Sequence, residues 1–251
     1  MGGALLFALL CALAALAYGG YSVKWILAKP DGNERMREIA QAIQEGADAV
    51  LVHHGWFWKN DDPRVVGMLR ERLALVLKHE LNLFAYHLPL DAHPVWGNNA
   101  QLAQVLGLVP GAAPASAAAA GLQPCTLGPD GLLWVGSMPG VSTLAQFRAR
   151  VQQRLGREPL VVGEPSAAVG RVVWCTGGAQ GYMQQAIDAG ATMYLTGEAS
   201  EYNTHLARES GCAFVAAGHH ATGRYGVQAL GQALAEAFGI EHRFIDCDNP
   251  V

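Results

Sequence analysis

One pattern occurs three times in the sequence: an amphipathic segment closed by glycine, a short apolar run, and then polar residues. The copies read A-Q-A-I-Q-E-G-A-D-A-V-L-V-H-H-G, Q-Q-A-I-D-A-G-A-T-M-Y-L-T-G-E and H-L-A-R-E-S-G-C-A-F-V-A-A-G-H-H. Helical spacing followed by an apolar run predicts alternating helices and mostly buried strands, hence an α/β fold. Ligands of such sheets bind beyond the carboxyl ends of the strands, where all three copies place their polar residues.

The polar residues at these strand ends are candidate metal ligands. His53 and His54 end the first copy, His219 and His220 end the third, and a further predicted strand at residues 83–87 leads into a turn carrying Asp91. Imidazole and carboxylate groups bind zinc, iron(II) or manganese. The alternative is structural: a histidine pair can be a surface feature, and Asp91 can cap a turn.

A site for two divalent ions follows from the adjacency of the first histidine pair. Neighbouring residues of a regular strand point to opposite faces, so His53 and His54 cannot both chelate one ion from extended backbone. Where the chain turns at Gly55, they can serve two neighbouring ions. Asp91 can bridge the ions with its two oxygens, and His219 would close the site from the far half of the chain.

Three other polar residues are candidates for catalysis: Glu198, His87 and His205. Each belongs to one of the motifs and could transfer protons at the same rim. The alternative is that they form hydrogen bonds that orient the metal ligands. The sequence has no G-x-x-x-x-G-K-[ST], G-x-G-x-x-G or G-x-S-x-G motif, which removes the support for kinase, dehydrogenase and serine-hydrolase functions.

Composition narrows the class of partner. The chain has 251 residues, 51% of them hydrophobic, which suffices for one large domain or two small ones. A net charge of −4 argues against a nucleic-acid polymer and leaves a small-molecule substrate of nucleotide size open. Five cysteines without a C-x-x-C pair argue against a disulfide framework and indicate a reducing compartment, the cytoplasm.

The pattern divides the chain into four parts. We expect an apolar N-terminal helix at residues 1–29, a first α/β lobe at 30–109 that lacks its N-terminal part, a linker with an inserted subdomain at 110–165, and a second lobe at 166–251 that completes the site. The low-complexity run P-G-A-A-P-A-S-A-A-A-A-G marks the linker. Residues 122–165 could instead form the outer part of the second lobe.

The apolar run at residues 5–21 has no charged residue and is about long enough to span a membrane. Lysines and arginines follow it, so the positive-inside rule would leave the remainder in the cytoplasm, with membrane contact through residues 5–21. The alternative is a buried helix. Residues 1–47, ending in G-N-E-R-M-R-E-I-A-Q-A-I-Q-E-G-A, resemble the N-terminus of a membrane-bound ion-pumping pyrophosphatase. None of that family's acidic motifs follows, so a chimeric N-terminus is expected rather than pyrophosphate hydrolysis.

From about Gly46 onward the sequence resembles the NIF-three-like family of dinuclear-metal proteins, some of which are GTP cyclohydrolase I type 2 homologues. The matching strings include G-A-D-A-V-L-V-H-H-G-W-F-W-K, H-L-P-L-D-A-H-P-V-W-G-N-N-A-Q-L, V-W-C-T-G-G, T-G-E-A-S-E and A-A-G-H-H-A-T-G-R-Y-G. The resemblance implies two α/β lobes, a metal pair in the cleft between them, and toroidal homo-hexamers built from dimers.

The resemblance also implies a ligand set: His53, His54, Asp91 and His219. The family's last ligand is a glutamate four residues after that final histidine, where this sequence has Gly223. One half of the metal pair is therefore expected to bind weakly. Two functions remain open, a metal-dependent hydrolase of a nucleotide or related small molecule, and a non-catalytic metal-binding oligomer or adaptor.

Overall fold

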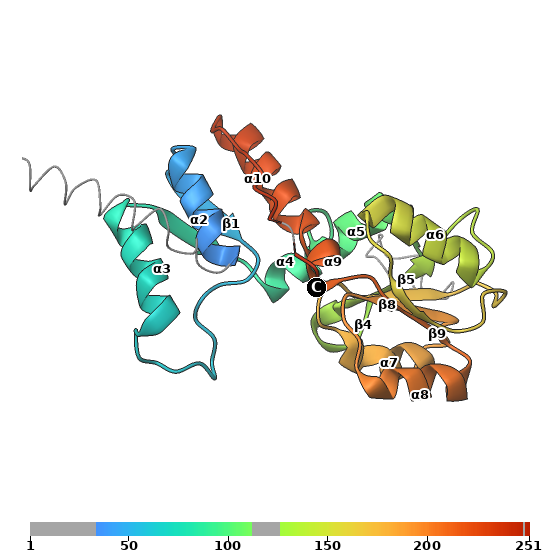
Figure 1. Cartoon of the computed structure of the whole chain (residues 1–251). Helices are drawn as coiled ribbons and strands as arrows, with labels where there is room; N and C mark the ends of the chain where they lie inside the picture. The colour runs from blue at the N-terminus through green and yellow to red at the C-terminus, as the bar shows by residue number, and fades with distance from the viewer. Residues whose placement is uncertain (1–33, 112–125, 248) are drawn as a thin grey trace, which may run out of the picture.

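The computed structural model describes residues 34–111, 126–247 and 249–251, which form a small lobe and a large lobe (Figure 1). The small lobe consists of α2 (Glu34–Gln44), β1 (Ala49–Val52), α3 (Gly67–Lys78) and β2 (Asn82–Ala85). Strands β1 and β2 are parallel and pair from Ala49 with Asn82 to Val52 with Ala85. A small core of Ile39, Trp56, Val76 and Leu81 holds this lobe together.

The large lobe is built on one sheet whose central strands are parallel. Its strands are β3 (Val109–Pro110), β4 (Thr126–Leu127), β5 (Leu133–Ser137), β6 (Leu160–Val162), β7 (Val172–Trp174), β8 (Met193–Thr196) and β9 (Ala213–Ala216). The order is β3-β5-β7-β8-β9-β6, and β4 pairs with β5. Strand β8 lies between β7 and β9 and is parallel to both, whereas β5 and β6 run antiparallel to their neighbours.

Helices cover both faces of this sheet (Figure 1). Helices α5 (Asn98–Leu106) and α6 (Leu144–Leu155) lie on one face, and α7 (Met183–Asp188) and α8 (Glu201–Ser210) lie on the other. Because side chains alternate along a strand, Trp174 and Leu195 pack toward the first pair of helices and their neighbours Val173 and Tyr194 toward the second. The central strands are therefore fully buried, as the sequence predicts.

The remaining helical segments connect the lobes or lie beside the sheet. They are α4 (Leu88–Ala92), η1 (Pro129–Gly131), η2 (Gln180–Tyr182), α9 (His219–Gly223) and α10 (Tyr225–Phe238). The glycines that close the three repeated helices have positive φ, 75° at Gly46, 76° at Gly190 and 72° at Gly211. Only glycine adopts this conformation at little cost, which explains why each helix ends there before its strand begins.

The structure differs from the sequence-based division in two respects. Residues 126–165 contribute β4, β5 and β6 to the large sheet, so they are its outer part rather than an inserted subdomain. The strands of the small lobe are only partly covered, in contrast to the mostly buried strands expected there, and Phe84 of β2 is 50% exposed. The apolar segment at residues 1–29 lies outside the described residues. Within the described ranges, no helix has the length and apolar character needed to cross a membrane.

Candidate metal centre

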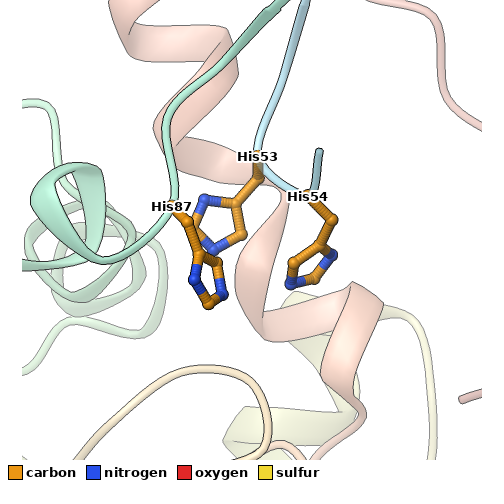
Figure 2. A group of neighbouring side chains, drawn as sticks. All are labelled: His53, His54 and His87. Carbon is orange, nitrogen blue, oxygen red and sulfur yellow. The ribbon is translucent and has the colours of Figure 1, made fainter. Parts of the chain in front are cut away.

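Three histidines converge where the two strands of the small lobe end (Figure 2). His53 and His54 follow β1, and His87 follows the parallel strand β2 by two residues. Each ring offers one nitrogen atom, and these three atoms lie within 4.8 Å of one another. The ring centroids of His53 and His54 are 4.7 Å apart, and His87 lies 4.9 and 5.2 Å from them. The register of β1 with β2 thus brings together residues 33 and 34 positions apart in sequence.

The large lobe adds a fourth histidine to this cluster. His219 begins α9 directly after β9, and its Nε2 lies 3.3 Å from Nε2 of His54. Gly177, in the turn after β7, has a φ of 70°, and a Cβ atom there would lie 3.0 Å from Nε2 of His219. Gly177, the first glycine of the V-W-C-T-G-G string, therefore leaves the space that the His219 ring occupies.

Hydrogen bonds to Nδ1 orient two of these rings. Nδ1 of His53 lies 2.9 Å from the carbonyl oxygen of Tyr86, and Nδ1 of His219 lies 2.6 Å from Oε1 of Glu198. A carbonyl or carboxylate oxygen only accepts, so both Nδ1 atoms carry the proton. When such a ring is neutral, as a metal ligand must be, its lone pair is on Nε2, the atom that faces the cluster. This arrangement of carboxylate, histidine and open Nε2 is typical of metal ligands.

Asp91 adds a buried carboxylate on α4. It is 7% exposed, and its Oδ2 lies 3.3 Å from Nε2 of His53. Asn98 donates to its Oδ1 at 2.9 Å and Thr176 donates at 3.3 Å. Burial alone would raise the pKa of Asp91, but in the metal-free protein the bond from the protonated form of His53, the positive charge of that ring and the bond from Asn98 outweigh burial, so this pKa is lowered. The carboxylate is therefore ionised at neutral pH, as a metal ligand must be.

The electrostatics of His87 also favour metal binding. Burial, and after it the neighbouring charge of His53, lower the pKa of His87, although Asp91 acts in the opposite direction. A lowered pKa keeps the imidazole neutral, and only the neutral ring has a lone pair for a metal ion. His87, expected from sequence to be catalytic, thus lies in a position where it could bind a metal ion.

A cavity of about 1280 Å³ opens beside this cluster, with walls from both lobes. His53, His54, His87 and His219 line it, together with Gly223. Gly223 is four residues after His219 on α9, and a Cβ atom at Gly223 would have no heavy atom within 4 Å. The place where the family is expected to have a glutamate is therefore open space next to the histidines.

Two of the sequence-predicted residues lie apart from the histidine nitrogens. His205 is on α8 with its side chain 62% exposed, 3.8 Å from Oε1 of Glu201, and is not among the residues that line the cavity. His220 turns toward Asp246 instead, with Nε2 3.0 Å from the carboxylate. Glu198 contacts the cluster through His219, and its second oxygen accepts a hydrogen bond from Gln180.

The sequence did not indicate the buried amide of Asn98 as part of the site. Neither asparagine is the cap of its helix, because Gly97 is the N-cap residue of α5. Asn98 is fully buried and donates to Asp91, while Asn99 accepts from the backbone N–H of Thr176. Two asparagines in succession at a helix start are compatible with capping, so only the tertiary structure separates the two roles.

The model of a family described as Duf34/NIF3 (NGG1p interacting factor 3) matches residues 33–250. The chain belongs to this family. Proteins named GTP cyclohydrolase 1 type 2 homolog from Allochromatium vinosum and Pseudomonas aeruginosa are 50% and 52% identical to it over 212 residues, which is 84% and 83% of this chain and 79% of each relative. A solved structure titled protein ybgI, of unknown function, has a TM-score of 0.73 at 40% identity and covers 85% of this chain and 81% of its own.

The Duf34/NIF3 match begins earlier than the sequence motifs indicate. It starts at residue 33, so α2 belongs to the family region, whereas the resemblance was expected to begin at about Gly46. The comparisons give no support to the likeness between residues 1–47 and a pyrophosphatase. The family region therefore includes α2 and the string Q-E-G-A.

Proposed function

We propose that this Duf34/NIF3 protein is a metal-dependent hydrolase of a nucleotide or a related small molecule, with two divalent ions bound at the cavity. The proposed ligands are His53, His54, Asp91 and His219, and His87 is a further candidate. Zinc, iron and manganese all suit a set of neutral imidazoles and one carboxylate.

The observation that carries the proposal is the meeting of Nε2 atoms from the two lobes. Nε2 of His219 lies 3.3 Å from that of His54, and Nε2 of His53 lies 3.3 Å from Asp91. Hydrogen bonds to Tyr86 and Glu198 hold the Nδ1 protons of His53 and His219 on the far side of each ring. Several buried or half-buried lone pairs that converge without a cation are costly, and a bound cation would offset this cost.

Bound divalent ions would supply an activated water molecule and an electrophile for a substrate oxyanion. The protein's own residues would bind and orient. Glu198 would fix the His219 ring, and Asn98 and Thr176 would hold Oδ1 of Asp91. His87 is neutral at physiological pH and half-buried at the cavity wall, so it can accept a proton there if it is not itself a ligand. His205 lies away from the cavity and has no part in this proposal.

Gly223 is the basis for proposing unequal metal affinities. A glutamate at this position would share one face of α9 with His219, because residues four apart lie one helical turn from each other. Glycine offers no side-chain oxygen, so the ion nearest His219 would be held by fewer protein ligands. We expect one ion to bind tightly and the other weakly.

The test is hydrolysis of a nucleotide panel by the purified protein with added manganese, iron or zinc. We compare wild type with Gly223→Glu and with the uncharged control Gly223→Gln. Open space at Gly223 allows both side chains. The proposal predicts that Gly223→Glu, but not Gly223→Gln, strengthens the weak site and raises the rate. An absence of activity in all three proteins with any of the metals would contradict the hydrolase function.

The second candidate function is a non-catalytic metal-binding oligomer or adaptor, and Gly223 favours it. A ligand that turnover requires would be retained in an enzyme, whereas a protein that only binds metal could function without it. Tighter metal binding by Gly223→Glu without any hydrolysis would support this alternative.

We also propose the assembly and location that the family resemblance implies, a homo-hexamer in the cytoplasm. Analytical ultracentrifugation gives the assembly directly, and a monomer would contradict it. Fractionation of cells that express the full chain tests membrane contact through residues 5–21. Recovery of the chain in the membrane fraction would indicate an anchor.

A further inference from the structure

A half-exposed tryptophan forms part of the cavity wall next to the histidine cluster. Trp58 is 43% exposed and lines the cavity together with His54 and His87. Its ring centroid lies 4.9 Å from that of His87, with the rings perpendicular at 87°, and 6.2 Å from that of His54. The indole of Trp58 therefore presents a large aromatic surface next to two of the candidate metal ligands, His54 and His87.

Two contacts orient this indole although much of it is exposed. Its Nε1–H donates to the carbonyl oxygen of Gly55 at 3.2 Å, and the edge contact with His87 sets the tilt of the ring. The hydrogen bond occupies the polar atom of the side chain and leaves apolar ring surface toward the cavity. An indole held in place with exposed apolar surface loses little conformational entropy when a ligand covers it, which is why such residues dominate binding sites.

The neighbouring residue provides a contrast. Phe57 is 69% exposed, but it is not among the residues that line the cavity. Exposure of an aromatic residue alone therefore does not distinguish Trp58. The distinguishing feature is exposure into the cavity beside the histidine nitrogens.

We propose that Trp58 is the binding platform for a planar heteroaromatic ring, of the nucleobase class, in the substrate. Aromatic rings stack with centroids about 4.5–7 Å apart, so a ring on Trp58 would lie beside His54 and His87. The ring of the substrate, and not only its phosphate groups, then contacts the protein at the metal centre. This inference rests on the proposed function and narrows its substrate class.

The test is calorimetric binding of two ligands that differ only in the base, guanosine monophosphate and ribose 5-phosphate, to manganese-loaded protein. We expect wild type to prefer the nucleotide. Trp58→Leu should bind it at least about tenfold more weakly, in the range that base–aromatic stacking contributes, with unchanged affinity for ribose 5-phosphate. Trp58→Tyr should retain most of the preference, and Phe57→Leu should match wild type. Equal melting temperatures confirm that the variants are folded.

Three results would overturn the inference: no binding of guanosine monophosphate by wild type, an unchanged nucleotide affinity in Trp58→Leu, or an equal loss for both ligands. Failure of the proposed function gives a different pattern. If binding depends on the base and on Trp58 but no nucleotide is hydrolysed, the hydrolase proposal fails and the inference stands. If nucleotides are hydrolysed but Trp58→Leu leaves KM unchanged, the inference about Trp58 fails and the hydrolase proposal stands.

Discussion

Replacement of Asn98 by alanine should weaken both the fold and the metal centre. The side chain of Asn98 is fully buried and links three elements: it donates to Asp91 on α4 at 2.9 Å and accepts from the backbone N–H of Gly226 on α10 at 2.7 Å. Loss of a hydrogen bond to a charged group costs about 1.5–3 kcal/mol, and a buried unpaired N–H costs about 1–3 kcal/mol. Asn98→Ala should therefore lower the free energy of unfolding by about 2.5–6 kcal/mol.

The assay is equilibrium unfolding by denaturant, followed by metal titration of the folded variant. Gln101→Ala is the matched control, because Gln101 is on the same helix and its side chain donates to the carbonyl oxygen of Val95 near the surface. We expect the control to lose about 1 kcal/mol or less. Asn98→Ala should also bind metal about 10- to 100-fold more weakly, as for other residues that orient ligands. A loss below about 1 kcal/mol, equal to that of the control, would refute the assigned role.

Three further predictions concern ionisation, metal removal and the outlying histidine. The pKa of Asp91 is lower in the folded protein than its value of about 3.9 in the unfolded chain. The ionised carboxylate therefore stabilises the fold above about pH 3.9, and this contribution is lost as the pH falls through the lower folded-state pKa. Metal-free Asp91→Asn should therefore be less stable than wild type at pH 7, with a difference that shrinks below about pH 4 in denaturant titrations. Chelation should lower the melting temperature of metal-loaded protein and added metal should restore it, because an ion that binds only the folded state stabilises it; an unchanged melting temperature would argue against a bound ion. His205→Ala should leave metal affinity unchanged and His219→Ala should abolish the weak site, as measured by calorimetry; equal effects would contradict the assigned positions.

The sequence was sufficient to predict much of the fold because its helix and strand signals are local. Each repeat carries its helix, its glycine stop and its apolar strand within about sixteen residues, and β8 and β9 form where the pattern places them. The pattern also places His53 and His219 at strand ends. It does not indicate that the two strands belong to different sheets, one in each lobe. That arrangement depends on packing between lobes, which no local pattern encodes.

The positions of the site residues depend on contacts between residues distant in the chain. The role of Asn98 depends on Asp91 and Gly226, the latter 128 residues away. His205 begins the third repeated string and belongs to α8, but it lies on the exposed side of that helix. Helical periodicity alone does not show which polar residue of an amphipathic helix faces a site. His87 was placed at the rim correctly, but its closeness to His53 and His54 follows from the register of β1 with β2.

The number of metal ions held by each chain decides whether the site is dinuclear. Isothermal titration of metal-free protein with manganese or zinc, checked by elemental analysis after dialysis, gives stoichiometry and affinity together. We expect two sites of unequal affinity, with one ion retained through dialysis and the other lost, and two retained ions in Gly223→Glu. Two equally tight ions in wild type would contradict the role given to Gly223, and no bound ion at all would contradict the metal centre itself.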